Sequence, residues 1–380
     1  MRIRAIENEQ EFLEIKEDWN RLAIGLSPFN DFDWMYKWWQ YFKGKNNLKI
    51  LVAEKNSRIT GIAPIYIKNI RVLKVLPFKK LCFLGENLSD YLDFLLDSEY
   101  KEETFEQLIN YIINKIDYDF LELGQLNSKY PNFTLWQKYT ENLKLEFVSN
   151  QECPRILLTN FASYDDFYKK MNKNLKGSIK FRQGKVRKHG INLEYIFKNE
   201  ITEKDIEVIS KISLKRQVFL YKKGDNKRFC YFVDKTKKNF IRDYFCSTNS
   251  ENTLLAYAVC NGEVVAYDLA LLSKDKMFLW NAAFDPDYDM YSPLKLLINE
   301  LLKYAFENNF KYFDFLRGKD RYKLEWTDNL SLNYKITRNN SAISHISHIY
   351  NNITPKFLLD LLRKPSKEIL QNNLNEYDYI

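Results

Sequence analysis

The feature that most constrains the fold is a pattern of strands and helix that occurs twice along the 380-residue chain. In the first half, two apolar runs at Leu48–Glu54 and Ile59–Ile67 flank a short polar turn. In the second half, Thr253–Cys260 and Glu263–Leu272 flank Asn261-Gly262. Asn-Gly between two apolar runs is typical of a type I′ turn, so both segments are expected to form β-hairpins.

An amphipathic helix and a further strand are expected after each hairpin, because apolar residues recur there at the spacing of one helix face. The helix residues are Phe105, Leu108, Ile109, Ile112, Ile113 and Ile116 in the first half, and Leu294, Leu297, Ile298, Leu301, Leu302, Ala305 and Phe306 in the second. The segments Tyr118–Leu123 and Tyr312–Leu316 follow as strands, and each contains Asp-Phe-Leu. Duplication of one α/β unit explains this repetition better than chance does.

The length of the chain also favours two domains, since it exceeds what one hydrophobic core usually serves. Hydrophobic residues make up 45% and aromatic residues 16%, which is enough to build two cores. The pattern breaks near Asn150–Pro154, where turn-forming residues gather. We therefore predict a first domain at 1–150, a second at 151–340 and a helical tail at 341–380.

Cysteine and histidine are too few and too scattered for a disulfide framework or a zinc site. The five cysteines form no Cys-x-x-Cys pair, and the three histidines are His189, His345 and His348. No Cys or acid near His345 and His348 completes a ligand set, so we predict no bound metal.

No stretch of the sequence approaches the roughly 18 apolar residues of a membrane span, and the N-terminus has no apolar signal core. We therefore expect a cytoplasmic protein without an integral membrane segment. The segment Thr354–Asn372 fits a peripheral membrane contact, because among its lysines it carries Phe357, Leu358, Leu361, Leu362, Ile369 and Leu370. A helix packed on its own domain is the alternative.

The formal net charge is +8 and the pI is near 8.9. This suits an anionic ligand such as a coenzyme, a nucleotide-linked sugar or tRNA. A generally lysine-rich proteome is the alternative explanation, so the local distribution of charge matters more than the total.

The segment from Trp280 to Leu294 carries the sharpest local signal. A strand is expected to end at Phe284, and Ser292 and Pro293 suit the N-cap and the first position of a helix. The N-terminus of a helix that follows a strand offers unpaired N–H groups for a pyrophosphate, and Lys295 adds a cation. An ordinary capped helix is the alternative.

The order of motifs resembles the CelD-type GNAT acetyltransferases, which are associated with cellulose and exopolysaccharide biosynthesis. The likeness spans about residues 19–330. In the second half it rests on Phe284–Tyr288, Ser292-Pro293, Phe313–Gly318, Tyr322-Lys323 and Trp326, and in the first half on Ser27-Pro28-Phe29, Trp34, Trp38, Trp39, Phe42, Leu84-Gly85 and Ser89–Phe94. The resemblance implies an α/β (α+β) fold of two tandem GNAT-like domains, each a mixed, mostly antiparallel sheet flanked by helices.

In that family the second domain is expected to hold acetyl-CoA or a longer acyl-CoA. The strand that ends at Phe284 would pair with the pantetheine amides, and the end of the helix would take the pyrophosphate. The implied coenzyme residues are Asn281, Ala283, Phe284, Tyr291, Ser292, Pro293, Leu294 and Lys295. The family usually has glycine where this chain has Leu294, so a side chain stands where the protein backbone would closely approach the phosphates of the coenzyme.

A basic segment at Lys169–Lys188 suggests a second anionic ligand, because no acid occurs between Asp166 and Glu194. It resembles the Lys/Arg-rich helix of Fem-type aminoacyl transferases, which share the tandem GNAT architecture and use aminoacyl-tRNA and nucleotide-linked cell-wall precursors. A solvated helix face is the alternative. We include Arg182 among the substrate-binding candidates.

Direct acyl transfer needs a base for the amine and an acid for the departing thiolate. Asp90, Asp93, Asp268 and Asp285 are the candidate bases, and Asp268 lies in an apolar strand where burial would raise its pKa. An outward-facing strand position is the alternative for Asp268. Tyr91, Tyr291 and Tyr322 are candidate acids.

The predicted substrate-binding residues are Trp34, Trp38, Tyr91 and Asp93 in the first half, with Arg182, Arg317 and Lys323 in the second. The leading prediction is an N-acyltransferase whose small-molecule amine acceptor, an amino-sugar or amino-acid-like compound, binds between two GNAT-like domains. A Fem-type, aminoacyl-tRNA-dependent transferase acting on a cell-wall precursor and a non-catalytic GNAT-like scaffold are the alternatives.

Overall fold

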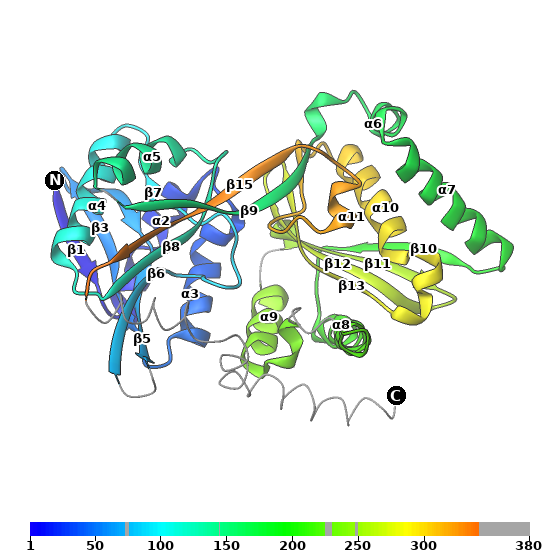
Figure 1. Ribbon diagram of the computed structural model, residues 1–380, viewed down its shortest axis with the longest axis horizontal. Helices are drawn as coiled ribbons and strands as arrows, with labels where there is room; N and C mark the ends of the chain where they lie inside the picture. The colour runs from blue at the N-terminus through cyan, green and yellow to red at the C-terminus, as the bar shows by residue number, and fades with distance from the viewer. Residues whose placement is uncertain (73–75, 144, 225–229, 248–249, 342–380) are drawn as a thin grey trace. The chain divides into compact units, whose positions relative to one another are not determined.

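The computed structural model describes the whole chain except residues 73–75, 144, 225–229, 248–249 and 342–380 (Figure 1). The described chain divides into two compact units, formed by residues 1–152 with 331–341 and by residues 153–330. The predicted helical tail after Ser341, with Thr354–Asn372, His345 and His348, lies outside the described residues. Residues 331–340, which the sequence analysis assigns to the second domain, belong to the first unit.

The first unit contains two sheets and five α-helices within its described residues. One sheet has the strand order β1-β3-β4-β7, and the other includes the order β15-β8-β6-β5-β2. The strands are β1 (Arg2–Ile6), β2 (Asn47–Leu48), β3 (Ile50–Lys55), β4 (Arg58–Ala63), β5 (Ile65–Val72), β6 (Leu76–Phe83), β7 (Leu95–Leu96), β8 (Phe120–Asn127) and β15 (Leu330–Asn339). The helices are α1 (Glu9–Glu14), α2 (Lys16–Ala23), the 3₁₀ turn η1 (Pro28–Asn30), α3 (Phe32–Phe42), α4 (Lys101–Lys115) and α5 (Phe133–Asn142).

The predicted first hairpin is confirmed as β3 and β4, which pair antiparallel. Asn56 and Ser57 at its tip have φ angles of 52° and 61°, the left-handed conformation that a type I′ turn requires. The second arm is shorter than predicted, because Pro64 has no N–H for the ladder and separates β4 from β5.

The second unit is built on a sheet with the strand order β10-β11-β12-β13-β14-β9. Its strands are β10 (Leu193–Lys198), β11 (Thr253–Cys260), β12 (Glu263–Ser273), β13 (Lys276–Phe284), β14 (Tyr312–Asp314) and the 153–157 portion of β9 (Glu146–Leu157). Its α-helices are α6 (Tyr164–Lys170), α7 (Lys173–Lys188), α8 (Glu203–Lys222), α9 (Lys235–Ser247), α10 (Pro293–Glu307) and α11 (Arg321–Leu324), and its 3₁₀ turns are η2 (Leu158–Asn160), η3 (Tyr231–Val233), η4 (Ser250–Asn252) and η5 (Pro286–Tyr291).

Helices cover both faces of the sheet in the second unit (Figure 1). Alternate residues of β11 and β12, together with α6, α7 and α10, form one apolar core. The opposite residues face α8, as shown by the Tyr257 hydroxyl, which lies 3.1 Å from a carboxylate oxygen of Asp205. Every strand pair in this sheet is antiparallel except β13–β14, among the pairs whose register the structure describes.

The predicted fold class is confirmed in both units. The strands form mixed, mostly antiparallel sheets, with β6–β8 parallel in the first unit and β13–β14 parallel in the second. The second predicted hairpin is β11–β12, which turns at Asn261 and Gly262 with φ angles of 50° and 88°.

Candidate functional site

Strand β13 separates from its parallel neighbour part-way along its length. It pairs with β14 only at Lys276–Phe278, and β14 ends at Asp314. Within the described residues, Leu279–Phe284 therefore pair on one side only, with β12. Backbone amides along such an edge can hydrogen-bond an extended ligand that itself carries amides.

A β-bulge at Trp280 accompanies this opening. Leu279 pairs with Ala270 and Asn281 pairs with Leu269, so Trp280 is an extra residue in β13. A bulge bends its strand and interrupts the regular ladder, and bulges are common next to active sites. The Trp280 ring stacks on Tyr231 at 5.5 Å and lies 5.4 Å from Phe245, which anchors the bulge on the α9 side of the sheet.

The strand residues predicted to bind the coenzyme lie on this opened portion of β13. The Tyr267 hydroxyl donates to the Asn281 side-chain oxygen (2.6 Å), and Ala283 is buried opposite Tyr267. The Arg216 guanidinium lies 4.2 Å from the centre of the Phe284 ring. The side chains of Asn281 and Phe284 are thus held by neighbours from β12 and α8.

Asp285, a predicted catalytic base, begins the turn between β13 and α10. One of its carboxylate oxygens accepts the Asp287 N–H (3.0 Å), and the other lies 2.7 Å from the Lys215 ammonium. The same ammonium lies 2.7 Å from Asp287. These contacts make Asp285 a helix cap and an ion-pair partner in this structure.

The start of α10 differs from the predicted capping. Pro293 is the first helical residue, as expected, but the Ser292 side chain makes no capping hydrogen bond. Ser292 has φ 48° and ψ 56°, a left-handed conformation in place of the extended one that an N-cap serine normally has. Leu294 is half-buried and packs against the core that α10 shares with the sheet.

Helix α7 lies beside the same connection. The Arg182 guanidinium donates to the Met290 carbonyl, and the His189 ring nitrogen lies 2.8 Å from the Tyr291 hydroxyl. The Lys295 ammonium pairs with Glu325 at 2.7 Å. The predicted coenzyme residues Tyr291 and Lys295 and the predicted substrate residue Arg182 therefore lie together at the N-terminal end of α10. The aspartates of the 285–289 turn add negative charge at the same place.

Asp268 occupies the middle of β12 and is 1% exposed, so the buried alternative holds and the outward-facing one is wrong. Its Oδ1 atom has no hydrogen-bond partner among the described residues. Burial raises the pKa of Asp268 well above its usual value, and the positive charge of Lys323 lowers it by less. An unpaired buried carboxylate is costly to stability and is a typical property of functional sites.

Lys323, a predicted substrate-binding residue on α11, is buried near Asp268. Its ammonium donates to the carbonyls of Phe315 (2.7 Å) and Arg317 (2.8 Å), so it holds the loop after β14. Leu316 in this loop has φ 58°, and its N–H donates to Asp314 (2.7 Å). Lys323 thus bonds to the Arg317 backbone and lies close enough to Asp268 for its charge to act on that carboxylate.

Tyr322, the predicted acid, precedes Lys323 on α11. Its side chain is half-buried and packs against the apolar core that α10 shares with the sheet. It is the candidate acid that is adjacent in sequence to Lys323.

The candidates in the first unit, Trp34, Trp38, Asp90, Tyr91 and Asp93, are all buried. The Trp34 indole N–H donates to the Ser89 hydroxyl (2.7 Å). The Trp38 ring lies 5.3 Å from the Tyr66 ring. The backbone carbonyl of Asp90 lies 3.4 Å from the hydroxyl of the serine at position 27.

Tyr91 and Asp93 fasten the 89–94 segment onto its surroundings. The Asn30 side chain donates to the Tyr91 carbonyl (2.7 Å), and Tyr91 has φ 57°. The Trp136 indole N–H and the Phe94 N–H each donate to Asp93 Oδ1 at 2.8 Å. In this structure these residues hold buried backbone in place.

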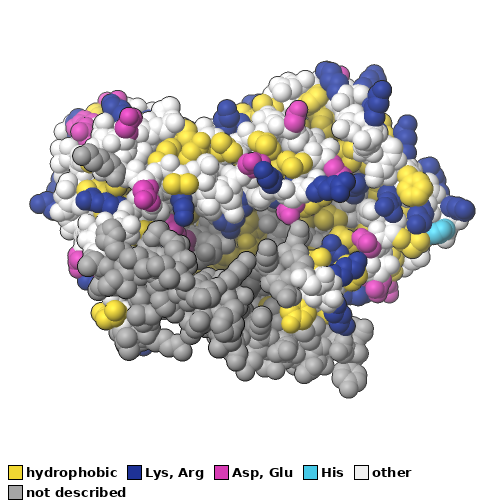
Figure 2. Space-filling view, viewed as in Figure 1, with side chains coloured by type: hydrophobic (Ala, Val, Ile, Leu, Met, Phe, Trp, Pro, Cys, Tyr) yellow, Lys and Arg dark blue, Asp and Glu magenta, His cyan; other side chains and the backbone are white. Residues whose placement is uncertain are grey.

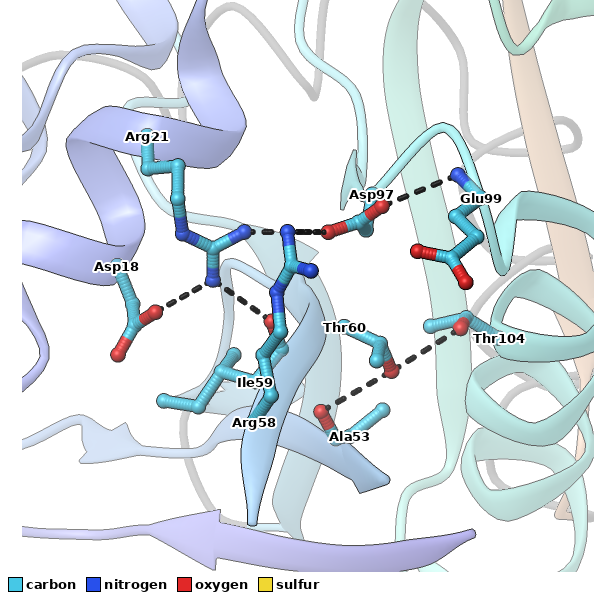
Figure 3. A network of polar contacts seen from close by, with 9 residues as sticks. All are labelled: Asp18, Arg21, Ala53, Arg58, Ile59, Thr60, Asp97, Glu99 and Thr104. Atoms are coloured by element: carbon cyan, nitrogen blue, oxygen red, sulfur yellow. Dashed lines mark hydrogen bonds and ion pairs between the residues drawn. The ribbon is translucent and has the colours of Figure 1, made fainter. Parts of the chain in front are cut away.

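A further buried aspartate in the first unit, Asp97, was not among the predicted residues (Figure 3). The guanidinium groups of Arg21 and Arg58 lie 3.2 Å and 2.6 Å from its Oδ2 atom. The Glu99 N–H donates to Oδ1 (3.0 Å), so both oxygens are paired. The partners come from α2, β4 and the turn after β7, and no short-range sequence pattern links them.

Comparison with known families identifies the class of domain in the second unit. Residues 213–324 match the model of the acetyltransferase (GNAT) domain. This stretch runs from α8 to α11 and includes the opened strand β13, Asp268 and Lys323. A comparison with curated proteins found no match.

Solved structures with the same fold extend over both units. FemX superposes with a TM-score of 0.60 at 10% identity, covering 93% of this chain and 100% of FemX. The C-terminal domain (DUF2156) of a putative lysylphosphatidylglycerol synthetase from Agrobacterium fabrum gives a TM-score of 0.54 at 11% identity, covering 91% of this chain and 97% of that one. L-PGS from Bacillus licheniformis gives 0.53 at 10% identity, covering 91% and 95%. At such identities the likeness shows the fold alone.

Two further findings concern the described residues only. None of their helices is both long and apolar enough to cross a membrane. No group of three or more His, Cys, Asp or Glu side chains among them is arranged to hold a metal ion. The five cysteines are free thiols, and four of them are buried.

Proposed function

We propose that this chain is an N-acyltransferase that moves an acyl group from acyl-CoA to the amine of an amino-sugar or amino-acid-like acceptor. The observation that carries the proposal is the opened edge of β13 next to the unpaired carboxylate of Asp268, within the segment that matches the GNAT domain. GNAT domains use acyl-CoA, which makes it the first donor to test.

The proposed chemistry is direct transfer without a covalent enzyme intermediate. The amine gives a proton to Asp268, its nitrogen forms a bond to the thioester carbon, and the carbon–sulfur bond breaks. Tyr322 is the proposed acid for the departing thiolate. Backbone N–H groups on the opened part of β13 would stabilise the oxyanion, and the start of α10 with Lys295 would receive the pyrophosphate.

The test is calorimetric titration with acetyl-CoA and with a longer acyl-CoA. We expect micromolar binding that falls at least tenfold in Ser292→Glu, because a carboxylate there repels the pyrophosphate. Glu307→Gln at the other end of α10 is the matched control and should bind normally. Mass spectrometry with a panel of amines then identifies the acceptor, including the amino-sugars that the CelD-type resemblance suggests. Absence of binding to either coenzyme would remove acyl-CoA as the donor.

A second candidate, transfer from aminoacyl-tRNA, is favoured by the charge on α7. Lys173, Lys180, Lys185, Arg187 and Lys188 have no carboxylate partner among the described residues. Dark-blue side chains accordingly gather over α6 and α7 in Figure 2. The shared fold with FemX agrees with this candidate but does not establish it.

Filter binding to aminoacyl-tRNA at several salt concentrations tests the second candidate. Replacing Lys173, Lys180 and Arg187 with Gln should weaken binding and reduce the salt dependence by about one unit of slope for each lost phosphate contact. Replacing Lys37, Lys101 and Lys138 of the first unit is the control. Binding that ignores the α7 substitutions would exclude this candidate.

A further inference from the structure

Within the sheet, the four side chains next to Asp268 on the same face are all alanines. Ala256 of β11 and Ala282 of β13 lie directly across from it, and Ala266 and Ala270 are its neighbours along β12 on the same face. Side chains that end at Cβ leave the Asp268 carboxylate as the group that extends furthest from this part of the sheet.

The Oδ1 atom of Asp268 is a buried acceptor without a donor among the described residues. Leaving such a group unpaired costs about 1–3 kcal/mol, more for a charged one, so native structures usually supply a partner. Lys323 supplies charge, but the hydrogen bonds that its ammonium is seen to make go to the Phe315 and Arg317 carbonyls. The missing donor is therefore expected to come from a ligand.

The Asp268 carboxylate lies close to the opened edge of the sheet. Ala282 belongs to the part of β13 that pairs with β12 alone, and Asp268 is its direct partner on β12. Asp268 thus lies one strand in from the edge, and the residue between them on this face of the sheet is an alanine. Ala282 is half-buried, whereas Asp268 is 1% exposed.

We propose that Asp268 and its four surrounding alanines form the recognition site for the protonated primary amine of the acceptor. This rests on the proposed function, and it adds that the acceptor is recognised as a compact ammonium ion. The ammonium donates to Oδ1, which satisfies the unpaired acceptor and places positive charge beside the carboxylate. A neutral molecule of the same shape lacks both contributions.

The protons balance over the reaction. The bound ammonium loses one proton to Asp268 and becomes the nucleophile. Tyr322 protonates the departing thiolate, and after attack the same nitrogen loses a second proton, which restores the Tyr322 hydroxyl. The amide, free coenzyme thiol and one proton, which Asp268 returns to solvent, are the products. Burial raises the pKa of Asp268 well above its usual value, whereas an ion pair with an ammonium favours the charged carboxylate, so formation of that pair is expected to release protons.

The test is calorimetry on the full chain without any acyl donor, using ethylamine and D-glucosamine as probes and ethanol and D-glucose as their neutral counterparts. Titrations in phosphate and in MOPS report proton release, since the apparent heat then follows the ionisation heat of the buffer. We expect the amines to bind with release of protons and the neutral counterparts to bind at least tenfold more weakly.

Two variants locate the effect. Asp268→Asn should lose at least tenfold in amine affinity together with the proton release, and Ala282→Leu should lose affinity by occupying the space beside Oδ1. Glu263→Gln, at the exposed start of the same strand, is the matched control and should behave as the wild type. Amine binding that persists unchanged in Asp268→Asn, or equal binding of amines and neutral counterparts, overturns the proposal.

Titration of Asp268→Asn with acetyl-CoA separates the two proposals. Retained coenzyme binding with lost amine binding supports both. If the wild type binds amines through Asp268 but binds no coenzyme, the recognition site stands and the acyl-CoA donor is wrong. If it binds coenzyme but no amine, the recognition site is wrong and the donor stands. Circular dichroism of each variant confirms folding, and the Asn side chain fits the same volume.

Discussion

Asp97 of the first unit and Asp268 of the second are both buried aspartates, and their surroundings differ in kind. Asp97 is 7% exposed, and its two oxygens are held by Arg21, Arg58 and the Glu99 N–H. Asp268 is 1% exposed, and its Oδ1 atom has no partner among the described residues. A buried carboxyl group without a hydrogen-bond partner is costly, so the comparison sets a carboxylate that is satisfied by the fold against one that the proposed function uses.

The pKa values of Asp93 and Asp268 show the same contrast between a buried aspartate with hydrogen-bond donors and one without them among the described residues. Burial raises its pKa to about 6, while hydrogen bonds from Trp136, Asn132 and the Phe94 N–H act in the opposite direction. Asp268 is equally buried but has no such donors, and its pKa rises well above the usual value. The hydrogen bonds therefore account for much of the difference between the two groups.

The largest expected effect separates activity from folding. Asp268→Asn should lower the rate of acyl transfer by about 10²–10⁴-fold, because the general base is removed. Coenzyme affinity should change by less than about twofold. Steady-state kinetics with the acceptor found by mass spectrometry, together with calorimetry, measures both. A fully active variant would show that Asp268 is not the base.

The next effect concerns the paired carboxylate. Asp97→Ala should lower the free energy of unfolding by about 2 kcal/mol, since it leaves Arg21 and Arg58 without their buried partner. This expected loss of stability is already reduced for the partial solvent exposure of the two arginine side chains, which weakens their ion pairs. Urea titration measures the change, and Ser98→Ala in the same turn is the control. Unchanged stability would mean that solvent replaces Asp97 without cost.

A smaller effect depends on pH and concerns Asp268 alone. With its folded pKa raised, Asp268 binds a proton in the folded state that the unfolded chain has already lost above about pH 4. Its contribution makes the protein less stable as pH rises from about 4 toward the folded pKa. Asp268→Asn should remove this slope and raise stability at neutral pH by about 1 kcal/mol, which thermal unfolding detects as a shift of about 2–4 °C.

One outcome would contradict this prediction of pH-dependent stability. If wild type and Asp268→Asn lose stability in parallel over the whole range, other groups cause the slope. Asp93 contributes with the same sign only up to its pKa of about 6, so measurements above that pH isolate Asp268.

The smallest effect comes from an exposed pair in the second unit. Asp287 lies 2.7 Å from Lys215, but its side chain is 72% exposed. Asp287→Asn should therefore change the free energy of unfolding by less than about 0.5 kcal/mol. Chemical denaturation beside the Asp97→Ala variant compares the two directly, and an effect above about 1 kcal/mol would show that burial is not what distinguishes them.

Local patterns predicted the elements of the fold well. Asn261-Gly262 between apolar runs marked a hairpin, and the apolar spacing after it marked α10, because turn geometry and helix periodicity are properties of neighbouring residues. Ser292 shows where local reasoning stops. The turn of η5 places it in a left-handed conformation, and its preference for capping does not apply.

The candidate site was predictable only in part. The apolar sequence around Asp268 indicated burial, but the absence of a donor and the approach of Lys323 depend on a contact 55 positions away. The ion pair of Asp285 with Lys215 crosses 70 positions in the same way. The aromatic and acidic motifs of the first unit drew attention to Trp34 and Asp93, whose contacts turn out to secure buried backbone.

The first unit is interrupted in the sequence by the second, and this affects the order in which the chain can fold. β15 forms the antiparallel ladder with β8, yet its residues follow the whole of the second unit. During synthesis the first unit therefore cannot complete this sheet, and the edge of β8 that pairs with β15 stays exposed until residue 339 leaves the ribosome. The second unit, which is continuous from residue 153 to residue 330, can complete its core earlier. We infer that the part of the chain made later folds first, and that a protein truncated before β15 would aggregate through the exposed edge.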